Sequence, residues 1–401
     1  MDPSTRRRTG GVLQALLLLS LAAHCCALGG LRLAVVGDFG SKDAGELAVS
    51  NLTQGWDTPS KLDAVISLGD NAYFFGLASE IQERIPPYYG WAITTDTATN
   101  RFWPCPGNHD WGGLCNDPKG LDPYLAYFKA LSSKPNPRVY EHIIGELHFF
   151  MLDSHCSEPL GVTVTSQQAA WLKAALAAST APFKIVAFHH PPFSSFRGYQ
   201  PNMDWPFAEW GADLVMAGHD HIYERLDNPR KVPGKDGFPY FVNGAGGQAL
   251  YTFSNPQPAS AFKYKSDFGA QLLTTKYRPF ASGAYYDLDL AFYSAGGGLN
   301  GGTLQECYRI TKLIGTGITP TTTYTAACPA VTAQSDYSLL TNKLAPAFAP
   351  SPLQKWRYFN AGKKALSVKS WTALAYDDSA WSVGASPLGY GAANDSAVPG
   401  L

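Results

Sequence analysis

Polar motifs rich in Asp, Asn, Tyr and His follow five short apolar runs of this sequence. Each run is typical of a buried strand, and in an open α/β sheet the carboxyl ends of the strands meet at one crevice. Side chains that are far apart in the sequence are therefore expected to lie together. In chain order, the motifs are Gly37-Asp38-Phe39-Gly40, Gly69-Asp70-Asn71-Ala72-Tyr73, Gly107-Asn108-His109-Asp110, His189-His190-Pro191 and Gly218-His219-Asp220-His221.

These residue types suit two metal ions bound side by side. Carboxylates and a phenolate favour a highly charged cation, whereas neutral imidazoles and an amide oxygen suit a divalent one. One shared carboxylate would hold the two ions about 3.5–4 Å apart. Taken singly, Asp38 is an ordinary turn residue and Tyr73 an ordinary half-buried aromatic. However, five of the nine histidines fall inside the motifs, and this clustering predicts a metal centre, with His142, His148 and His155 as structural residues.

The apolar runs and the segments between them predict an α/β layered fold. A helix is expected over Gln167–Ala178, where apolar residues recur at helical spacing and Thr165 with Gln168 can form a capping box. The Gly-rich segment Ala295–Gly302 is expected to connect two strands of a hairpin. The expected strands are Leu31–Val36, Ala64–Leu68, Phe102–Pro104, Leu147–Leu152, Lys184–Phe188, Ala212–Ala217, Phe241–Asn243, Tyr285–Phe292 and Leu304–Ile310.

The ordered set of motifs resembles the signature of the purple acid phosphatases, within the calcineurin-like metallophosphoesterases. The spacing from Asp70 to Tyr73 is similar to that of the small, tartrate-resistant type. The resemblance spans residues 31–312 and implies a four-layer α/β/β/α metallophosphoesterase sandwich. The ligands that it implies are Asp38, Tyr73 and His221 for a ferric ion, Asn108, His189 and His219 for a divalent ion (Fe, Zn or Mn), and Asp70 as the bridge between the two metals.

The same resemblance implies an acid phosphatase that hydrolyses phosphate monoesters. A metal-bound hydroxide would attack the phosphorus in line, because a trivalent cation lowers the pKa of bound water enough for hydroxide to persist at acid pH. The catalytic residues would be Asp70 and His109, with His109 protonating the leaving group or binding the phosphate. Asn108 is a further candidate contact to the substrate, and His190 is expected to orient the ligands or to contact the substrate.

One segment departs from the family pattern. Family members place another histidine a few residues after the position of His189, whereas residues 194–199 here read Ser-Ser-Phe-Arg-Gly-Tyr. The planar fork of Arg197 matches phosphate oxygens, so Arg197 is a candidate substrate contact. A solvated loop charge is the equal alternative for this arginine. Asp110 and Asp220 are expected to orient the neighbouring ligands.

Two alternative functions stay open at this point. The same fold and metal centre serve phosphodiesters and nucleotides, so a metal-dependent phosphodiesterase or nucleotide hydrolase is the first alternative. A secreted binding protein with a vestigial metal centre is the second. Small phosphate esters are the expected substrates, and a net charge of −1 over 401 residues gives no bulk electrostatic attraction to nucleic acid or acidic membranes.

The amino terminus predicts entry into the secretory pathway. Three arginines precede the apolar run 12–23, and small residues follow, which is typical of a signal peptide over residues 1–27. An uncleaved anchor is the alternative, but the run is too short to span a bilayer comfortably. We therefore expect a protein without a stable membrane anchor in the medium, the vacuole or the cell wall. Two sequons, at Asn51 and Asn394, fit a glycoprotein.

After the leader, residues 28–313 are expected to form the metallophosphoesterase domain. Residues 314–353, rich in Thr, Ala and Pro, are expected to be a linker, and 354–401 a truncated β-sandwich-like module with carbohydrate or cell-wall contact as its candidate role. Five cysteines remain after cleavage, an odd number that leaves one free. The sequence does not determine their connectivity; the pairing that we expect is Cys115–Cys156 and Cys307–Cys328, with Cys105 free and buried.

Overall fold

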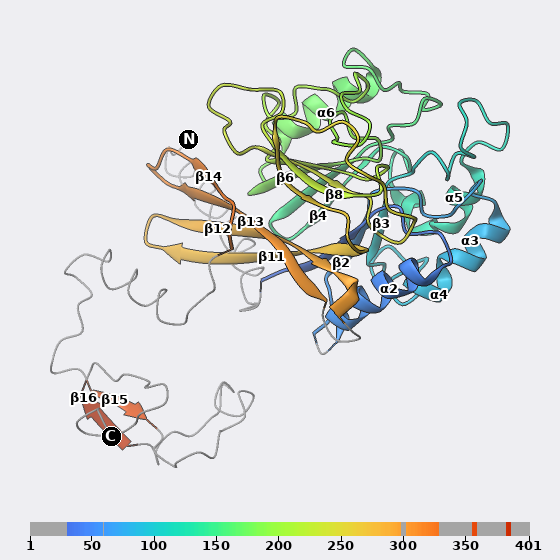
Figure 1. The fold of residues 1–401 in the computed structure, drawn as a ribbon. Coiled ribbons are helices and arrows are strands. Elements are labelled where there is room, and N and C mark those ends of the chain that lie inside the picture. Colours follow the sequence, from blue (N-terminus) through green and yellow to red (C-terminus); the bar gives the residue numbers. More distant parts are fainter. Residues whose placement is uncertain (1–29, 59, 298–301, 329–354, 359–381, 386–401) are drawn as a thin grey trace, which may run out of the picture. The chain divides into compact units, whose positions relative to one another are not determined.

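Two seven-stranded mixed sheets form the larger of two units in the computed structural model (Figure 1). The structure describes residues 30–58, 60–297, 302–328, 355–358 and 382–385. In the first sheet the strand order is β14-β13-β12-β11-β1-β2-β3, with β1, β2 and β3 parallel to one another and the remaining pairs antiparallel. Its strands are β1 (Arg32–Val36), β2 (Ala64–Ser67), β3 (Phe102–Pro104), β11 (Gly269–Phe280), β12 (Gly283–Ser294), β13 (Thr303–Gly315) and β14 (Thr321–Thr325).

The second sheet has the order β10-β8-β9-β7-β6-β5-β4, in which β5, β6, β7 and β9 are parallel neighbours. Its strands are β4 (Tyr140–Ile144), β5 (Leu147–Met151), β6 (Phe183–Ala187), β7 (Leu214–Ala217), β8 (Tyr223–Asp227), β9 (Pro239–Asn243) and β10 (Ser260–Tyr264). The helices of this unit are α2 (Ala44–Asp57), α3 (Ala78–Arg84), α4 (Pro86–Tyr89), α5 (Asp122–Tyr127) and α6 (Gln167–Ala178), with 3-10 turns η2 (Lys129–Ser133) and η3 (Ala295–Gly297).

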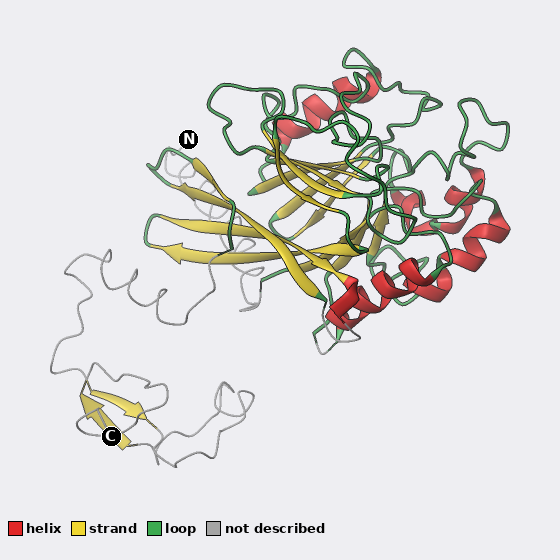
Figure 2. Ribbon diagram, in the orientation of Figure 1, coloured by secondary structure: helices red, strands yellow, loops and turns green. Residues whose placement is uncertain are grey.

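The strand periodicity explains how the layers pack. On β5, Phe149 belongs to the core between the two sheets, whereas its neighbour Phe150 belongs to the core beneath α6. Because successive side chains of a strand point to opposite faces, a strand that is buried on both faces is apolar at most positions, and His148 is the one polar residue of β5. Leu172 and Leu176 of α6 cover this outer face, and Figure 2 shows α2 to α5 beside the other sheet. These four layers confirm the predicted α/β/β/α sandwich.

Most expected elements agree with the structure to within a few residues, and α6 agrees at both ends. The expected capping box is wrong. Ser166 is the N-cap, and its hydroxyl accepts a hydrogen bond from Ala169 N at 3.1 Å. The side chain of Gln168 instead donates from Nε2 to the backbone oxygen of Asp153 at 2.9 Å. This buried amide therefore holds the loop after β5 against α6.

The first sheet continues into the segment that the sequence predicts to be a linker. Strand β14 pairs antiparallel with β13 inside residues 314–353, and the first compact unit ends at Cys328. In the second unit, Pro329–Leu401, the described residues form an antiparallel pair of strands, β15 (Lys355–Tyr358) with β16 (Ser382–Ala385). The predicted signal peptide and the sequon at Asn394 lie outside the described residues.

The cysteine prediction is confirmed. Disulfides join Cys115 to Cys156 and Cys307 to Cys328, and Cys105 is free and buried. None of the described helices has the length and hydropathy needed to cross a bilayer.

Candidate metal centre

The structure brings the seven predicted ligands to one edge, where parallel strands of both sheets end. Three of these strands, β1, β2 and β3, lie in the first sheet, and two, β6 and β7, lie in the second. The residues that follow them are, in this strand order, Asp38, Asp70 with Tyr73, Asn108, His189 and His219, and His221 follows two residues after His219. The crevice between the carboxyl ends of the strands is thus lined with metal-binding side chains.

The first ligand set is a triangle of Asp38, Tyr73 and His221. The phenol oxygen of Tyr73 lies 3.2 Å from Asp38 Oδ1 and 3.1 Å from His221 Nε2. His221 Nε2 lies 3.4 Å from Asp38 Oδ1, and all three side chains are buried. Carboxylate, phenol and imidazole groups therefore converge on one point, which is the donor set of a hard cation.

The second set consists of Asn108, His189 and His219, with Asp70 between the two sets. His189 Nε2 lies 3.1 Å from Asn108 Oδ1, 3.2 Å from His219 Nδ1 and 3.2 Å from Asp70 Oδ2. His189 Nδ1 faces the carbonyl oxygen of Leu68 at 2.8 Å. Because a carbonyl only accepts, Nδ1 carries a hydrogen, and in the neutral ring Nε2 then presents a lone pair. Two acceptors, Nε2 and Asn108 Oδ1, thus face each other, an arrangement that a cation between them would stabilise.

The glycines of the motifs hold these ligands in place. A Cβ at Gly107 would lie 2.2 Å from Asp70 Oδ1, and one at Gly218 would lie 2.5 Å from Asp38 Oδ2. Each motif therefore leaves room for the ligand that a neighbouring strand supplies. Asp38 and Asp70 themselves adopt φ values of 58° and 52°, in the left-handed region that few non-glycine residues occupy. Such strain is found where surrounding contacts hold a functional side chain in place.

The electrostatics also fit a pair of cations. Asp38 and Asp70 are fully buried, and the ion-pair partners of these two carboxylates are histidines. Burial, together with the carboxylates of Asp70 and Asp38, raises the pKa of the Tyr73 hydroxyl well above its ordinary value. Formation of the phenolate here thus depends on positive charge, which two metal ions would supply. The donor set therefore fits the centre that the sequence resemblance implies.

Two further carboxylates lie behind the ligands, as the sequence predicts. Asp110 Oδ2 accepts from Gly107 N at 2.8 Å and from Asn71 Nδ2 at 2.9 Å, which joins the loops after β3 and β2. Burial, with the nearby charge of Asp70, raises the pKa of Asp110 to about 6. Asp220 Oδ1 accepts from Arg197 Nε at 2.8 Å.

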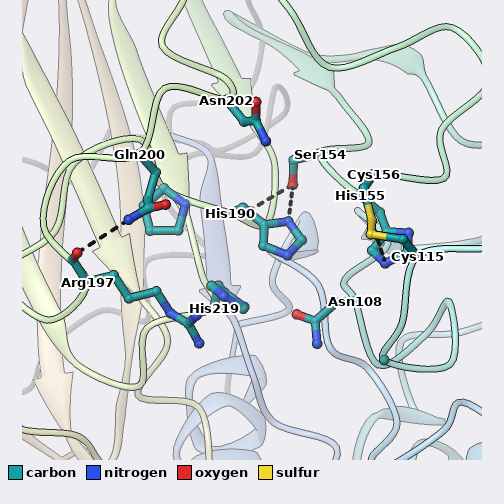
Figure 3. A pocket seen from close by; sticks show the side chains of 12 residues that line it. Asn108, Cys115, Ser154, His155, Cys156, His190, Arg197, Gln200, Asn202 and His219 are labelled. Atoms are coloured by element: carbon teal, nitrogen blue, oxygen red, sulfur yellow. Dashed lines mark hydrogen bonds between the residues drawn. A yellow bond between two sulfur atoms is a disulfide. The ribbon is translucent and has the colours of Figure 1, made fainter.

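A pocket opens beside the second ligand set (Figure 3). Its volume is about 460 Å³, and its lining includes Asn108, His190, Arg197 and His219. The sequence candidates Asn108, His190 and Arg197 thus lie around one space, whereas His109 is not among its lining residues. His109 N donates to Asp70 Oδ1 at 2.9 Å, and His109 Nε2 lies 3.9 Å from Asp70 Oδ2.

Sequence reasoning missed the remaining residues that line this pocket. The pocket lining also contains Ser154, Gln200, Asn202 and the Cys115–Cys156 disulfide. It also contains His155, which the sequence analysis treated as a structural residue. These residues lie in loops without a motif of their own, so only the pairing of β5 with β6 and the disulfide would have located them.

The comparisons with known proteins agree with this geometry. Residues 31–223 match the calcineurin-like phosphoesterase family. Tartrate-resistant acid phosphatase type 5 from Rattus norvegicus is 27% identical over 264 residues, which cover 58% of this chain and 77% of the relative. The human protein of the same name is also 27% identical, over 276 residues, 59% of this chain and 78% of the relative.

Two plant proteins extend these similarities. Purple acid phosphatase 15 from Arabidopsis thaliana is 26% identical over 48% of this chain and 40% of the relative. The structure of a purple acid phosphatase from yellow lupin (Lupinus luteus) seeds superposes with a TM-score of 0.52 at 20% identity, over 71% of this chain and 54% of the lupin chain. This last match supports the fold. The chain therefore contains a calcineurin-like phosphoesterase domain and is similar to tartrate-resistant and purple acid phosphatases.

Proposed function

We propose that this chain is an acid phosphatase that hydrolyses phosphate monoesters at a dinuclear Fe(III)–M(II) centre. The observation that carries the proposal is the pair of ligand sets that converge on Asp70: Asp38, Tyr73 and His221 on one side, and Asn108, His189 and His219 on the other. The family match and the acid phosphatase relatives support a phosphoester hydrolase. When bound, the two cations would supply a hydroxide nucleophile and neutralise the charge of the phosphoryl oxygens.

We propose that His109 protonates the leaving group. Its Nδ1 lies 2.6 Å from the carbonyl oxygen of Phe74, so Nδ1–H donates there and Nε2 is the nitrogen that gains or loses a proton. The side chain of His109 is 27% exposed, which allows it to reach a substrate oxygen.

Asn108 and Arg197 are the proposed phosphate contacts. The Oδ1 atom of Asn108 faces His189 Nε2, so its amide hydrogens are left for a phosphoryl oxygen. Arg197 is 44% exposed, and its Nε is held by the fully buried Asp220. A positioned guanidinium would bind a phosphate group at a smaller entropic cost than a mobile one. This pairing favours a substrate contact over a solvated loop charge for Arg197.

The cellular location of the protein and the role of residues 354–401 are proposals as well. Entry into the secretory pathway through residues 1–27 is supported by the two disulfides, which persist in oxidising compartments. Asn51 lies inside α2 beside the buried Thr53, and glycosylation there stays a prediction. A carbohydrate or cell-wall contact of residues 354–401 also stays a prediction.

The first test combines metal analysis with the visible spectrum of the purified full chain. A phenolate on ferric iron should give a charge-transfer band, and Tyr73→Phe should bleach it while a Tyr124→Phe control, altered outside the centre, keeps it. A colourless protein that contains only divalent metals would exclude the ferric centre.

The second test measures the substrate class and the role of His109. We expect faster hydrolysis of a phosphate monoester than of the matched diester over the acid to neutral range. His109→Gln should lower kcat by about 10²–10⁴-fold for alkyl monoesters and by much less for p-nitrophenyl phosphate, whose leaving group needs no proton. His142→Gln, altered at a histidine whose ring contacts Trp103 outside the metal centre, is the control. Faster diester cleavage, or no turnover in the metal-loaded protein, would contradict the proposal.

A further inference from the structure

A serine–histidine pair in the pocket wall presents a hydrogen-bond donor to the metal centre. Ser154 Oγ lies 2.9 Å from the backbone nitrogen of His190 and 2.8 Å from its ring atom Nδ1 (Figure 3). Ser154 follows β5 and is 5% exposed, and both residues line the pocket beside Asn108 and His219. Neither contact depends on a bound ligand.

The two contacts assign the ring hydrogen of His190. The backbone N–H of His190 can only donate, so Ser154 Oγ accepts it with one lone pair. Among the described residues, the hydroxyl hydrogen of Ser154 has no acceptor other than Nδ1, so it is directed to Nδ1, which accepts. In a neutral ring the hydrogen therefore sits on Nε2.

The position of His190 leaves two roles for the nitrogen that faces the centre. A ring nitrogen of His190 lies within 4.8 Å of ring nitrogens of both His189 and His219, so the three could hold one metal ion. A nitrogen that carries a hydrogen has no lone pair to give a metal, whereas it can donate to a phosphoryl oxygen. The tautomer decides between these roles.

We propose that Ser154 is a positioning residue that holds His190 as the Nε2–H tautomer, and that this N–H donates to a phosphoryl oxygen of the substrate or product. The inference rests on the proposed phosphatase function, because it assumes a phosphate group at the centre. It adds Ser154 to the proposed site and excludes His190 from the metal ligands.

The fold offers a matched control for this pair. Ser179 Oγ lies 2.8 Å from His148 Nδ1, in a second serine–histidine pair at the end of α6. Neither residue lines the pocket. Loss of the Ser179 hydroxyl therefore reproduces the chemical change without touching the site.

The first measurement is the tautomer itself. The full chain, loaded with diamagnetic Zn²⁺ and labelled with ¹⁵N in histidine, should show the long-range ¹H–¹⁵N pattern of an Nε2-protonated ring for His190. Ser154→Ala should shift this pattern toward the Nδ1-protonated form, and Ser154→Thr, which keeps a hydroxyl, should retain it. An Nδ1-protonated ring in the unaltered protein overturns the assignment, as does direct Zn²⁺ coordination of His190.

The second measurement is the binding of inorganic phosphate to the same Zn²⁺-loaded protein. Loss of one neutral hydrogen bond corresponds to about a five- to tenfold weaker Kd, which we expect for Ser154→Ala and His190→Ala. Ser154→Thr and Ser179→Ala should stay within about twofold, and metal content should not change. Unchanged phosphate affinity in Ser154→Ala overturns the inference. Absence of monoester turnover in a protein that shows these tautomer and phosphate results would instead reject the proposed phosphatase function.

Discussion

Replacement of Gly218 by alanine tests whether the motif glycines position the metal ligands. A Cβ at this position would lie 2.5 Å from Asp38 Oδ2, about 0.8 Å inside an ordinary carbon–oxygen contact. Asp38 cannot turn away freely, since Oδ2 accepts from His219 N at 2.7 Å and Oδ1 lies 3.2 Å from the Tyr73 oxygen. The added methyl group must therefore displace a predicted ligand of the first metal.

The expected result of Gly218→Ala is a loss of metal affinity that exceeds any loss of stability. Displacement of a group that orients a metal site costs about 10–100-fold in affinity, or about 1.4–2.7 kcal/mol. Competition with a chelator of known affinity measures this loss for each metal, and chemical denaturation of the metal-free protein measures the unfolding free energy. Steady-state hydrolysis of a monoester at saturating metal then reports any remaining distortion.

Gly211→Ala is the control for this experiment. Gly211 has a φ of 98° and open space around the position of a Cβ. Alanine there should strain the backbone and lower the unfolding free energy by about 1–2 kcal/mol, with metal affinity unchanged. If Gly218→Ala binds both metals as tightly as the unaltered protein, the steric argument for the motif glycines is wrong.

Three further predictions concern stability and the pocket wall. Burial raises the pKa of Glu46 to about 9, so the native state holds this proton more tightly than the unfolded chain does. The contribution of Glu46 to stability is therefore greatest below about pH 4.5 and is lost as the pH rises toward about 9, by at most about 1.4 kcal/mol per pH unit. Urea unfolding at several pH values should show that the unfolding free energy of Glu46→Gln depends less on pH than that of the unaltered protein. Asp110→Ala leaves the buried N–H of Gly107 without an acceptor and should lower the unfolding free energy, measured by denaturant titration, by about 2–4 kcal/mol. An unchanged denaturation midpoint would show that the loops after β2 and β3 do not depend on this carboxylate. The Cys115–Cys156 disulfide joins cysteines 41 residues apart in the sequence, so its loss should lower the unfolding free energy by about 4 kcal/mol. Because the bond lies in the pocket wall and not at the predicted metal ligands, its loss should also raise KM more than it lowers kcat. Equal effects on the two constants would contradict this placement.

The convergence of these side chains could be predicted from the sequence because its physical signals are local. An apolar run such as 102–104 shows where a buried strand ends, and the polar residue after it lies at the crevice whatever the strand order is. The structure places β3 at Phe102–Pro104, with Asn108 four residues later. Local patterns were equally sufficient for α6, whose apolar spacing agrees with both of its ends.

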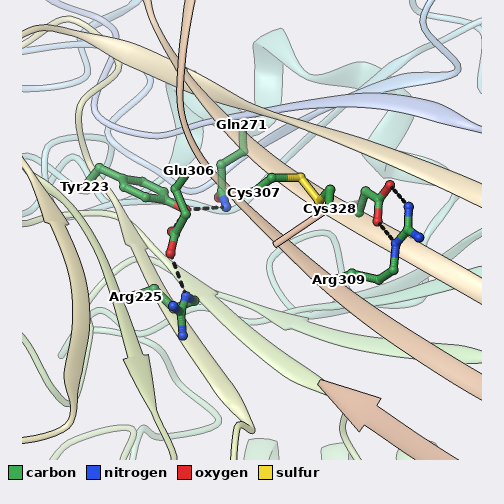
Figure 4. Close-up of a disulfide and its surroundings, with 8 residues drawn as sticks. Tyr223, Arg225, Gln271, Glu306, Cys307, Arg309 and Cys328 are labelled. Atoms are coloured by element: carbon green, nitrogen blue, oxygen red, sulfur yellow. Dashed lines mark hydrogen bonds and ion pairs between the residues drawn. A yellow bond between two sulfur atoms is a disulfide. The ribbon is translucent and has the colours of Figure 1, made fainter. Parts of the chain in front are cut away.

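Strand β8 shows where local patterns fail. It reads Tyr-Glu-Arg-Leu-Asp, a composition typical of an exposed segment, yet its first four residues are buried. Glu306 of β13 accepts from the Tyr223 hydroxyl at 2.9 Å and from Arg225 Nε at 2.8 Å, beside the Cys307–Cys328 disulfide (Figure 4). A carboxylate of the first sheet therefore pairs with a buried arginine of the second sheet. Because a buried charge is tolerated only with its partner, and the partner lies about 80 residues away in sequence, neither residue alone indicates a core strand.

The pocket wall depends on a third kind of information, the register between strands. Strands β5 and β6 pair in parallel with Met151 opposite Ala187, so the residues three positions further along, Ser154 and His190, leave the sheet side by side. A shift of one residue in this register would separate them and would turn every side chain of β5 to the other face. Apart from His148, both faces of β5 are apolar, so its own sequence distinguishes the two registers only weakly. The hydroxyl that assigns the His190 tautomer is therefore a consequence of how two strands pair, and no motif within either strand could have predicted it.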